Sequence, residues 1–175
     1  MKPRALSTVG CGLLTLVLAG AAWADITSKP RMISAQRGAP LLISLDVDAT
    51  EAEAVAGING RLTYDPAIFH NPAIGLQVGA AGFTALGNEV APGDFRFVIY
   101  ANPTATMNLN LPVAEFNIDV DPLAPFNTTQ TLSFDTAAAG SPEGQSFAAQ
   151  GKSVSFADFV VNINANAAEA WAVYE

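Results

Sequence analysis

Carboxylates are the main residues of this chain that could do chemistry, because histidine and cysteine are almost absent. One histidine, His70, and one cysteine, Cys11, occur in 175 residues, too few for a nucleophilic triad or a zinc site. The sequence also lacks a glycine-rich phosphate-binding loop. His70 lies in a turn-rich segment, 66–72, and we expect it to be a polar loop residue. These absences disfavour the common nucleophilic, zinc-dependent and nucleotide-binding enzymes.

Two pairs of aspartates provide carboxylates two residues apart. Asp46 with Asp48, and Asp119 with Asp121, each fall on one face of an expected strand. Two acids a few ångströms apart could serve a glycosidase, and a cluster of oxygen ligands could hold calcium. A solvated sheet face that resists edge pairing accounts for the same residues, and we favour it. We therefore expect no catalytic residue, no metal and no cofactor.

The balance of charge and hydrophobicity indicates a folded protein without a nucleic-acid partner. Eight basic and sixteen acidic residues give a formal net charge of −8, which repels a phosphate backbone. Half of the residues are hydrophobic and 14% are charged. The chain can therefore bury enough apolar surface to offset the conformational entropy that is lost on folding.

Residues 1–24 have the pattern of a secretory signal peptide. Two basic residues among the first four precede an apolar run, 9–21, and Ala22-Trp23-Ala24 resembles a cleavage site. The run is shorter than the ~20 apolar residues that span a bilayer, so we expect no membrane span. The prediction is export to the periplasm, the cell surface or the medium. Cys11 would leave with the peptide, so the exported protein would contain no disulfide.

Apolar and polar residues alternate with period two through most of the remaining chain. In 41–48, for example, every second residue is Leu, Ile or Val, which is typical of a half-buried strand. Strands are expected over 26–35, 41–48, 58–64, 83–86, 95–100, 114–121, 129–135, 154–156 and 159–164. Turn-forming Pro, Gly, Asn and Asp residues separate them. The pattern predicts an all-β protein, an antiparallel β-sandwich over residues 25–164, with 165–175 as a C-terminal tail.

The order of these segments resembles the cohesin domain of cellulosome scaffolds and related exported bacterial proteins. The similar segments are 38–48, 55–66, 67–69, 94–101, 111–120, 154–156 and 160–163. The second of them ends in Tyr64-Asp65-Pro66, which looks like the end of a cohesin strand. The resemblance implies a nine-stranded jelly-roll sandwich that binds dockerin modules through one sheet face. In such systems this binding attaches enzymes of polysaccharide breakdown to a scaffold or surface.

The resemblance also implies a binding surface next to this motif. Tyr64 points inward by its alternation, and counting back from it gives the outward positions of the strand. They are Gly57, Asn59, Arg61 and Thr63. Similar cohesins use polar residues near the first two positions to contact dockerin. Gly57 departs from that pattern because it has no side chain.

Two classes of binding function are consistent with the sequence. A cohesin-like module would bind a dockerin-containing protein, with Asn59, Arg61, Thr63 and Tyr100 as the partner-binding residues. A carbohydrate-binding module, the alternative, would bind polysaccharide by stacking sugar rings on exposed aromatic side chains. Tyr100 is the one plausible platform residue, because Trp171 lies in the tail. We favour protein binding.

Overall fold

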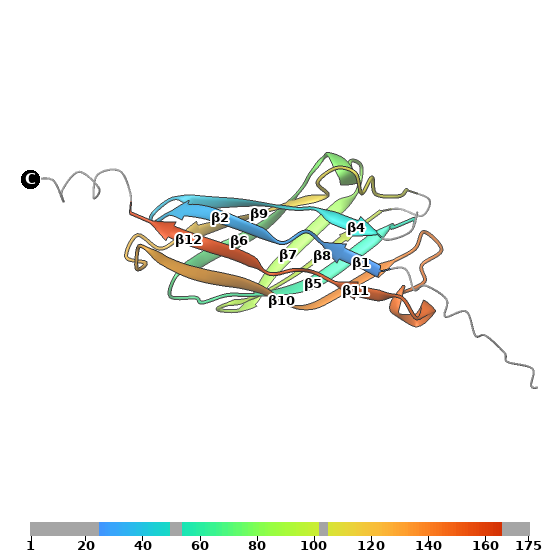
Figure 1. Ribbon diagram of the computed structural model, residues 1–175. Helices are drawn as coiled ribbons and strands as arrows, with labels where there is room; N and C mark the ends of the chain where they lie inside the picture. Colours follow the sequence, from blue (N-terminus) through green and yellow to red (C-terminus); the bar gives the residue numbers. More distant parts are fainter. Residues whose placement is uncertain (1–24, 50–53, 102–104, 166–175) are drawn as a thin grey trace, which may run out of the picture.

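The computed structural model describes residues 25–49, 54–101 and 105–165, and across these ranges the chain forms twelve strand segments and two short 3-10 helices (Figure 1). The strands are β1 (Asp25–Ser28), β2 (Arg31–Gln36), β3 (Pro40–Leu45), β4 (Val47–Ala49), β5 (Gly57–Thr63), β6 (Phe69–Leu76), β7 (Thr84–Ala91), β8 (Asp94–Tyr100), β9 (Ala114–Val120), β10 (Thr128–Gly140), β11 (Ser153–Ser155) and β12 (Phe159–Asn164). The 3-10 helices are η1 (Val78–Ala80) and η2 (Ala148–Gln150). The expected signal peptide, 1–24, and all but the first residue of the expected tail lie outside the described residues.

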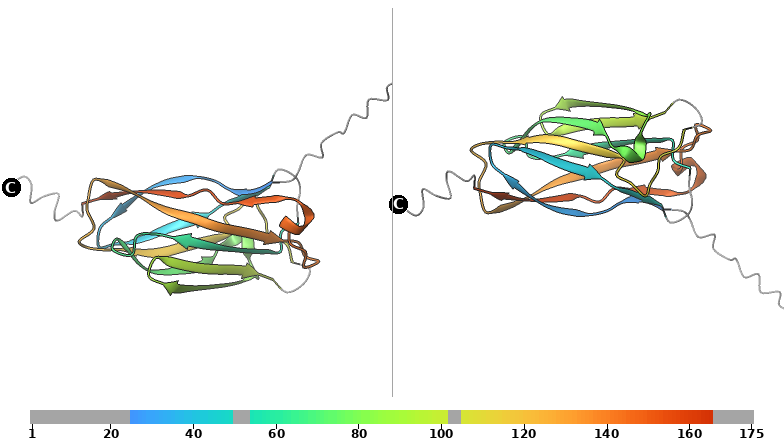
Figure 2. Two further views of the ribbon diagram at one scale, coloured as in Figure 1. Left: turned by 90° about the horizontal axis from the view of Figure 1, so that it is seen from below. Right: turned by 90° about the horizontal axis from the view of Figure 1, so that it is seen from above.

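Two layers of strands pack face to face as a β-sandwich (Figure 2). One layer is the six-stranded sheet β2-β12-β10-β5-β8-β7, and the other is the sheet β3-β9-β6. A small sheet, β11-β1-β4, joins the layers, because β1 continues into β2 and β4 follows β3. The all-β sandwich prediction is confirmed. Most neighbours are antiparallel, but β1 pairs with β11, and β2 with β12, in parallel.

Several strand boundaries differ from the expected ones for local reasons. The expected strand 26–35 is divided at Lys29-Pro30, since proline has no N–H to donate to a neighbouring strand. The expected strand 41–48 is divided at Asp46, and three residues separate β11 from β12. The number of strands therefore depends on whether such short breaks are counted.

Strand β6 was not expected, because its Asn71-Pro72 has the composition of a turn. Asn71 adopts a left-handed φ of 50°, and the pairing of β6 with β9 shifts between His70 and Ala73. This irregularity accommodates the proline without ending the strand. The prediction that His70 is a loop residue was wrong, because His70 lies within β6 and pairs with Asp119 of β9.

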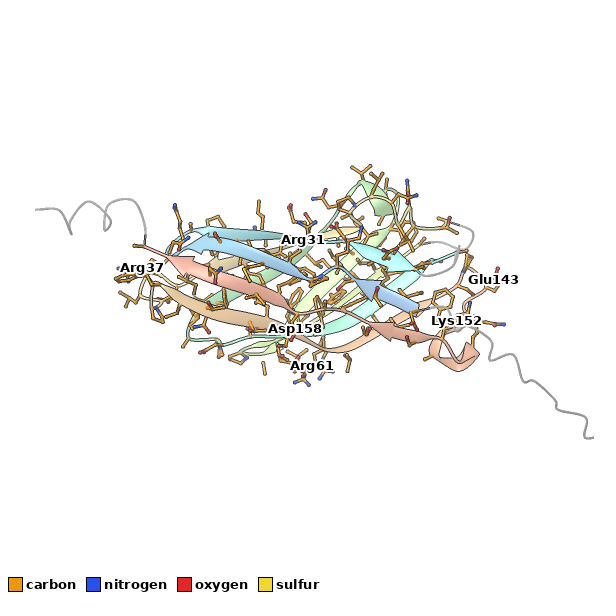
Figure 3. All side chains as sticks on the ribbon, viewed as in Figure 1. Arg31, Arg37, Arg61, Glu143, Lys152 and Asp158 are labelled. Carbon is orange, nitrogen blue, oxygen red and sulfur yellow. The ribbon has the colours of Figure 1, made fainter. Side chains whose placement is uncertain are left out.

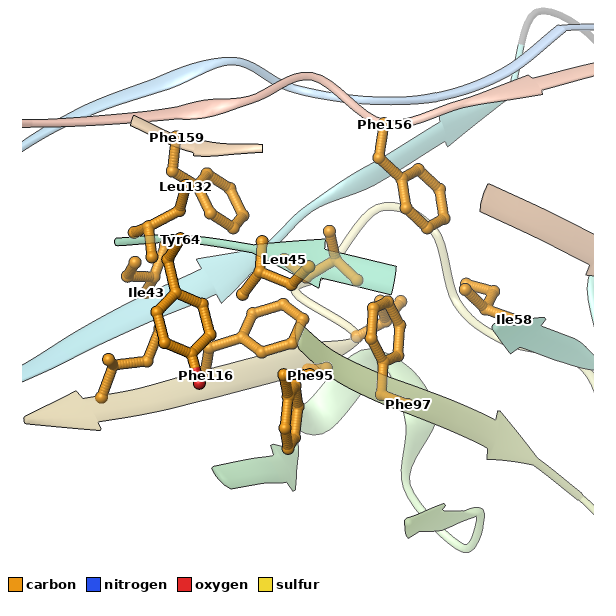
Figure 4. Close-up of a cluster of buried hydrophobic side chains, with 14 of the residues drawn as sticks. Ile43, Leu45, Ile58, Tyr64, Phe95, Phe97, Phe116, Leu132, Phe156 and Phe159 are labelled. Atoms are coloured by element: carbon orange, nitrogen blue, oxygen red, sulfur yellow. The ribbon is translucent and has the colours of Figure 1, made fainter. Parts of the chain in front are cut away.

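The core forms where the inward side chains of the two layers meet (Figure 4). Phe116 of β9 is fully buried, and its ring centroid lies 5.2 Å from that of Phe97 in β8. Leu62 of β5 is also fully buried. Gly60 leaves room for the Phe97 ring, since a Cβ atom there would lie 2.7 Å from it. With alternate residues of β5 and β8 fixed inward, the residues between them must face outward.

The hairpin of β7 and β8 is fastened to the turn after β5 by a buried tyrosine. The Tyr64 hydroxyl donates a 2.5 Å hydrogen bond to the Glu89 carboxylate, which also accepts the Gly93 backbone N–H at 3.1 Å. Burial is the main reason that the pKa of Tyr64 is raised, and the bond to Glu89 adds to it. The hydroxyl therefore remains a donor that holds the hairpin in position.

Candidate binding face

The outward side of β10, β5, β8 and β7 carries all four predicted partner-binding residues, and we call this surface the outer face (Figure 2, left). Its side chains form rows across the strands, each written in the order β10, β5, β8, β7. The first row is Gly140, Gly57, Tyr100 and Thr84; the second is Ala138, Asn59, Val98 and Leu86; the third is Thr136, Arg61, Arg96 and Asn88. Thr63 lies in a fourth row, between Ser133 and Asp94.

The Arg61 side chain projects from the sandwich at the charged end of the outer face (Figure 3). Two carboxylates hold it there. Its Nε donates to Asp94 Oδ1 at 2.9 Å, and its Nη1 lies 2.9 Å from Asp135 Oδ2. Asp135 reaches this position because it is the extra residue of a bulge, where the register of β10 shifts between Phe134 and Thr136. The bulge therefore turns the Asp135 carboxylate toward Arg61.

The hydrogen bond between Arg61 and Asp94 favours the charged form of both side chains. Because Arg61 donates a hydrogen bond to it, the pKa of Asp94 is lowered, and the same bond raises the pKa of Arg61. Arg96 Nη2 lies 3.7 Å from the second oxygen of Asp94. This end of the outer face thus presents fixed, opposite charges instead of an isolated cation.

The opposite end of the outer face is hollow. A depression of about 440 Å³ lies over Gly57 and Gly140, lined by residues of β5, β8, β10 and the loop 141–146. Tyr100 and Val98 line it from the β8 side, and Pro142 lines it from the loop. The Tyr100 side chain is 43% exposed, which makes it available for contact.

The other predicted residues differ in what they offer a partner. Asn59 is exposed in the second row, between the hollow and the charged end. Thr63 is half-buried, and its hydroxyl donates to the Ser133 carbonyl at 3.3 Å, so it supports the pairing of β5 with β10. Sequence reasoning missed Leu86 and Asp135. Only the strand register places Leu86 beside Val98, in the same row as Asn59, and only the bulge brings Asp135 to Arg61.

Three of the four aspartates that could have supported catalysis have separate structural partners, and within the described residues Asp48 accepts only the backbone N–H of the next residue, Ala49. Asp46 forms an ion pair with Arg31. Asp119 accepts a hydrogen bond from Asn71 Nδ2 at 3.0 Å. Asp121 accepts the Leu123 backbone N–H at 2.6 Å and lies 2.9 Å from His70 Nε2, and these two bonds, the backbone bond first, lower its pKa.

Two kinds of feature are absent from the described part of the chain. In residues 25–49, 54–101 and 105–165, no three His, Cys, Asp or Glu side chains are grouped as metal ligands. Within the same ranges, no helix has the length and hydropathy needed to cross a membrane.

Solved structures match this architecture, although no family model and no curated protein matches the sequence. A cohesin module from a Clostridium perfringens family 33 glycoside hydrolase superposes with a TM-score of 0.64 at 16% identity, covering 82% of this chain and 98% of the module. The chain has the cohesin fold. The OlpC cohesin of Clostridium thermocellum, solved in complex with Doc435, gives 0.62 at 11% identity, with 82% and 95% covered. A non-cellulosomal cohesin of Archaeoglobus fulgidus gives 0.57 at 14% identity, with 88% and 99% covered.

Proposed function

We propose that this protein is a non-catalytic binding module that recognises a dockerin-type partner through the outer face. The observation that carries the proposal is the register of β10, β5, β8 and β7, which gathers Asn59, Arg61 and Tyr100 on one outward surface of a cohesin fold. Several structures with this fold were solved as complexes with a dockerin. Thr63 would contribute at the margin of the surface.

The composition of the outer face supports a protein partner. Leu86 is 55% exposed and pairs directly with Val98, and Tyr100 lies in the adjoining row. Apolar and aromatic side chains at the centre of a patch, with oriented charges beside them, are typical of protein interfaces. The acidic chain favours a partner whose contact surface is basic or rich in hydroxyl groups.

The cellular setting is part of the same proposal. The pattern of residues 1–24 supports export, and binding to a dockerin would take place in the periplasm, at the cell surface or in the medium. There the module would attach a dockerin-bearing enzyme, in polysaccharide breakdown or on the cell surface.

Polysaccharide binding receives little support from the described part of the chain. Its exposed large aromatic side chains are Tyr100 and Phe126. Phe126 lies between β9 and β10, and its ring is covered by the Arg37 guanidinium at 4.8 Å. Tyr100 therefore has no aromatic neighbour on the outer face with which to form a platform for sugar rings.

A binding panel tests the proposal. The purified protein is titrated by calorimetry with dockerin modules, among them Doc435 and the Cel5 dockerin, and is separately incubated with insoluble cellulose, chitin and xylan. We expect at least one dockerin to bind with a micromolar or lower Kd, and no polysaccharide to retain the protein. Binding to a polysaccharide that Tyr100→Ala abolishes, with no dockerin bound, would reverse the assignment.

A further inference from the structure

We propose that two copies of this protein pair edge to edge through strand β7, as a symmetric antiparallel dimer. β7 (Thr84–Ala91) is the last strand of the six-stranded sheet, and β8 is its only strand partner in the described part of the chain. The backbone groups along its other edge are therefore open to a further strand. The inference concerns this edge and does not depend on the proposed function, which uses the outer face.

The edge of β7 lacks the features that usually keep a strand from pairing with another molecule. Such edges are commonly short, or carry proline, a bulge or a free charge. β7 has eight residues and contains no proline, lysine or arginine, and the irregularity in its pairing lies at one end, between Glu89 and Ala91. The Glu89 carboxylate is held inside the hairpin by the Tyr64 hydroxyl and the Gly93 N–H. The one charge of β7 is thus directed away from its free edge.

The other strands that end a sheet are better protected. In the described residues, β4 and β11 have three residues each, and β6 is interrupted by Pro72. β2 and β3 are joined to each other, since Arg31 of β2 forms an ion pair with Asp46, which follows β3. β6 approaches β7 from beneath, where its Ile74 lies close to Gly87. The long edge that remains available is that of β7.

The charge of the molecule favours a contact at this edge. The chain has sixteen acidic and eight basic residues, so two copies repel each other over most of their surfaces. Along β7, the alternate residues Thr84, Leu86, Asn88 and Val90 are all exposed, and none of them is charged. Two β7 strands can therefore approach without placing like charges opposite each other.

Symmetry selects one register for this pair of strands. Opposite residues of antiparallel strands point to the same side, so both outer faces lie on one side only if the twofold axis passes through a residue. An axis through Asn88 places Asn88 opposite Asn88 of the second copy, and Leu86 opposite Val90. Leu86 and Val90 are 55% and 48% exposed, and this register lets each cover the other. An axis through Gly87 would instead place Leu86 opposite Asn88.

The contact is small, so the dimer should be weak and reversible. One strand edge buries less area than the ~1,200–2,000 Å² of a standard interface. The protein is therefore studied by sedimentation equilibrium from micromolar to millimolar concentration. We expect the average mass of the wild type to rise toward twice that of the monomer across this range.

A pair of charge variants tests the symmetric register. Asn88→Lys and Asn88→Asp should each weaken the dimer about tenfold or more, because each places like charges face to face. An equal mixture of the two variants should associate again as a heterodimer. Met32→Lys is the matched control, because Met32 is 75% exposed on β2 at the opposite edge of the same sheet, and we expect it to leave the equilibrium unchanged. Circular dichroism verifies that each variant folds.

The wild type alone provides a second measurement that needs no variant. In a dilution series of ¹⁵N-labelled protein, the amide signals of β7 should shift with concentration and those of β2 should not. A wild type that stays monomeric at millimolar concentration would overturn the inference, as would a mixture of the Asn88 variants that fails to associate. A monomer whose β7 signals shift when a dockerin is added would assign this edge to that partner instead. Dimerisation is measured without a dockerin, so its failure would leave the proposed function intact.

Discussion

Tyr100 and Arg61 stand at the two ends of the outer face, and each has a property expected of a residue that dominates binding. Tyr100 is an exposed aromatic side chain beside a hollow, and Arg61 is already oriented by two carboxylates. Truncation of either to alanine should weaken binding of a dockerin by ~2 kcal/mol or more, and Asn59→Ala should cost less. Calorimetry checks this, with Leu42→Ala, exposed on β3 of the other layer, as the control. Losses as large for the control would show that the interface lies elsewhere.

Asp94 gives the fold a dependence on pH. Because its pKa in the folded protein is below the usual 3.8, its ionised form stabilises the fold above that value. This contribution is lost as the pH falls through the folded pKa. Wild type should therefore lose stability to urea below about pH 4, and Asp94→Asn should lose less over the same range. Parallel pH profiles for the two proteins would contradict the assignment, and Asp121, whose pKa is also lowered, accounts for part of the remaining slope.

Strand β5 determines which side chains reach the outer face, and its alternation can be tested by stability. Leu62 is fully buried, whereas its neighbour Thr63 is half-buried on the outward side. Leu62→Ala should lower the free energy of unfolding by ~2–5 kcal/mol, and Thr63→Ala by less than about 1. Urea titration of both variants measures this. Similar losses would mean that the register of β5 is wrong.

The sequence was sufficient wherever a property depends on neighbours along the strand. Period two correctly turned Leu62 and Tyr64 inward and Asn59 and Arg61 outward. It could not predict β6, whose Asn71-Pro72 is absorbed by an irregularity that pairing with β9 makes possible. The alternation also could not predict which residues of different strands lie side by side. The link of Asp135 to Arg61 depends on a bulge, and the hollow depends on a loop that returns beside Gly140.

The molecule as a whole is stabilised by one core that both layers share, and Phe116 lies at its centre. Its ring packs against Phe97, Phe134 and Phe159, with centroids 5.2, 6.0 and 6.1 Å away. Phe116→Ala should therefore cost ~3–5 kcal/mol, because the surrounding rings cannot all close the cavity. Circular dichroism and hydrogen exchange should show that this variant unfolds in a single transition, at a lower temperature than the wild type. Loss of one layer before the other would show that the layers are independent.

The parallel pairing of β2 with β12 also has a mechanical consequence. The strands run in register from Arg31 opposite Phe159 to Gln36 opposite Asn164, and β1 and the end of β12 lie at opposite ends of the sandwich (Figure 1). Tension between Asp25 and Asn164 would pull these neighbouring strands lengthwise past each other. The hydrogen bonds between them would then share the load and would have to break together instead of one after another. A module that tethers a partner would in this way resist force along the axis on which it is pulled.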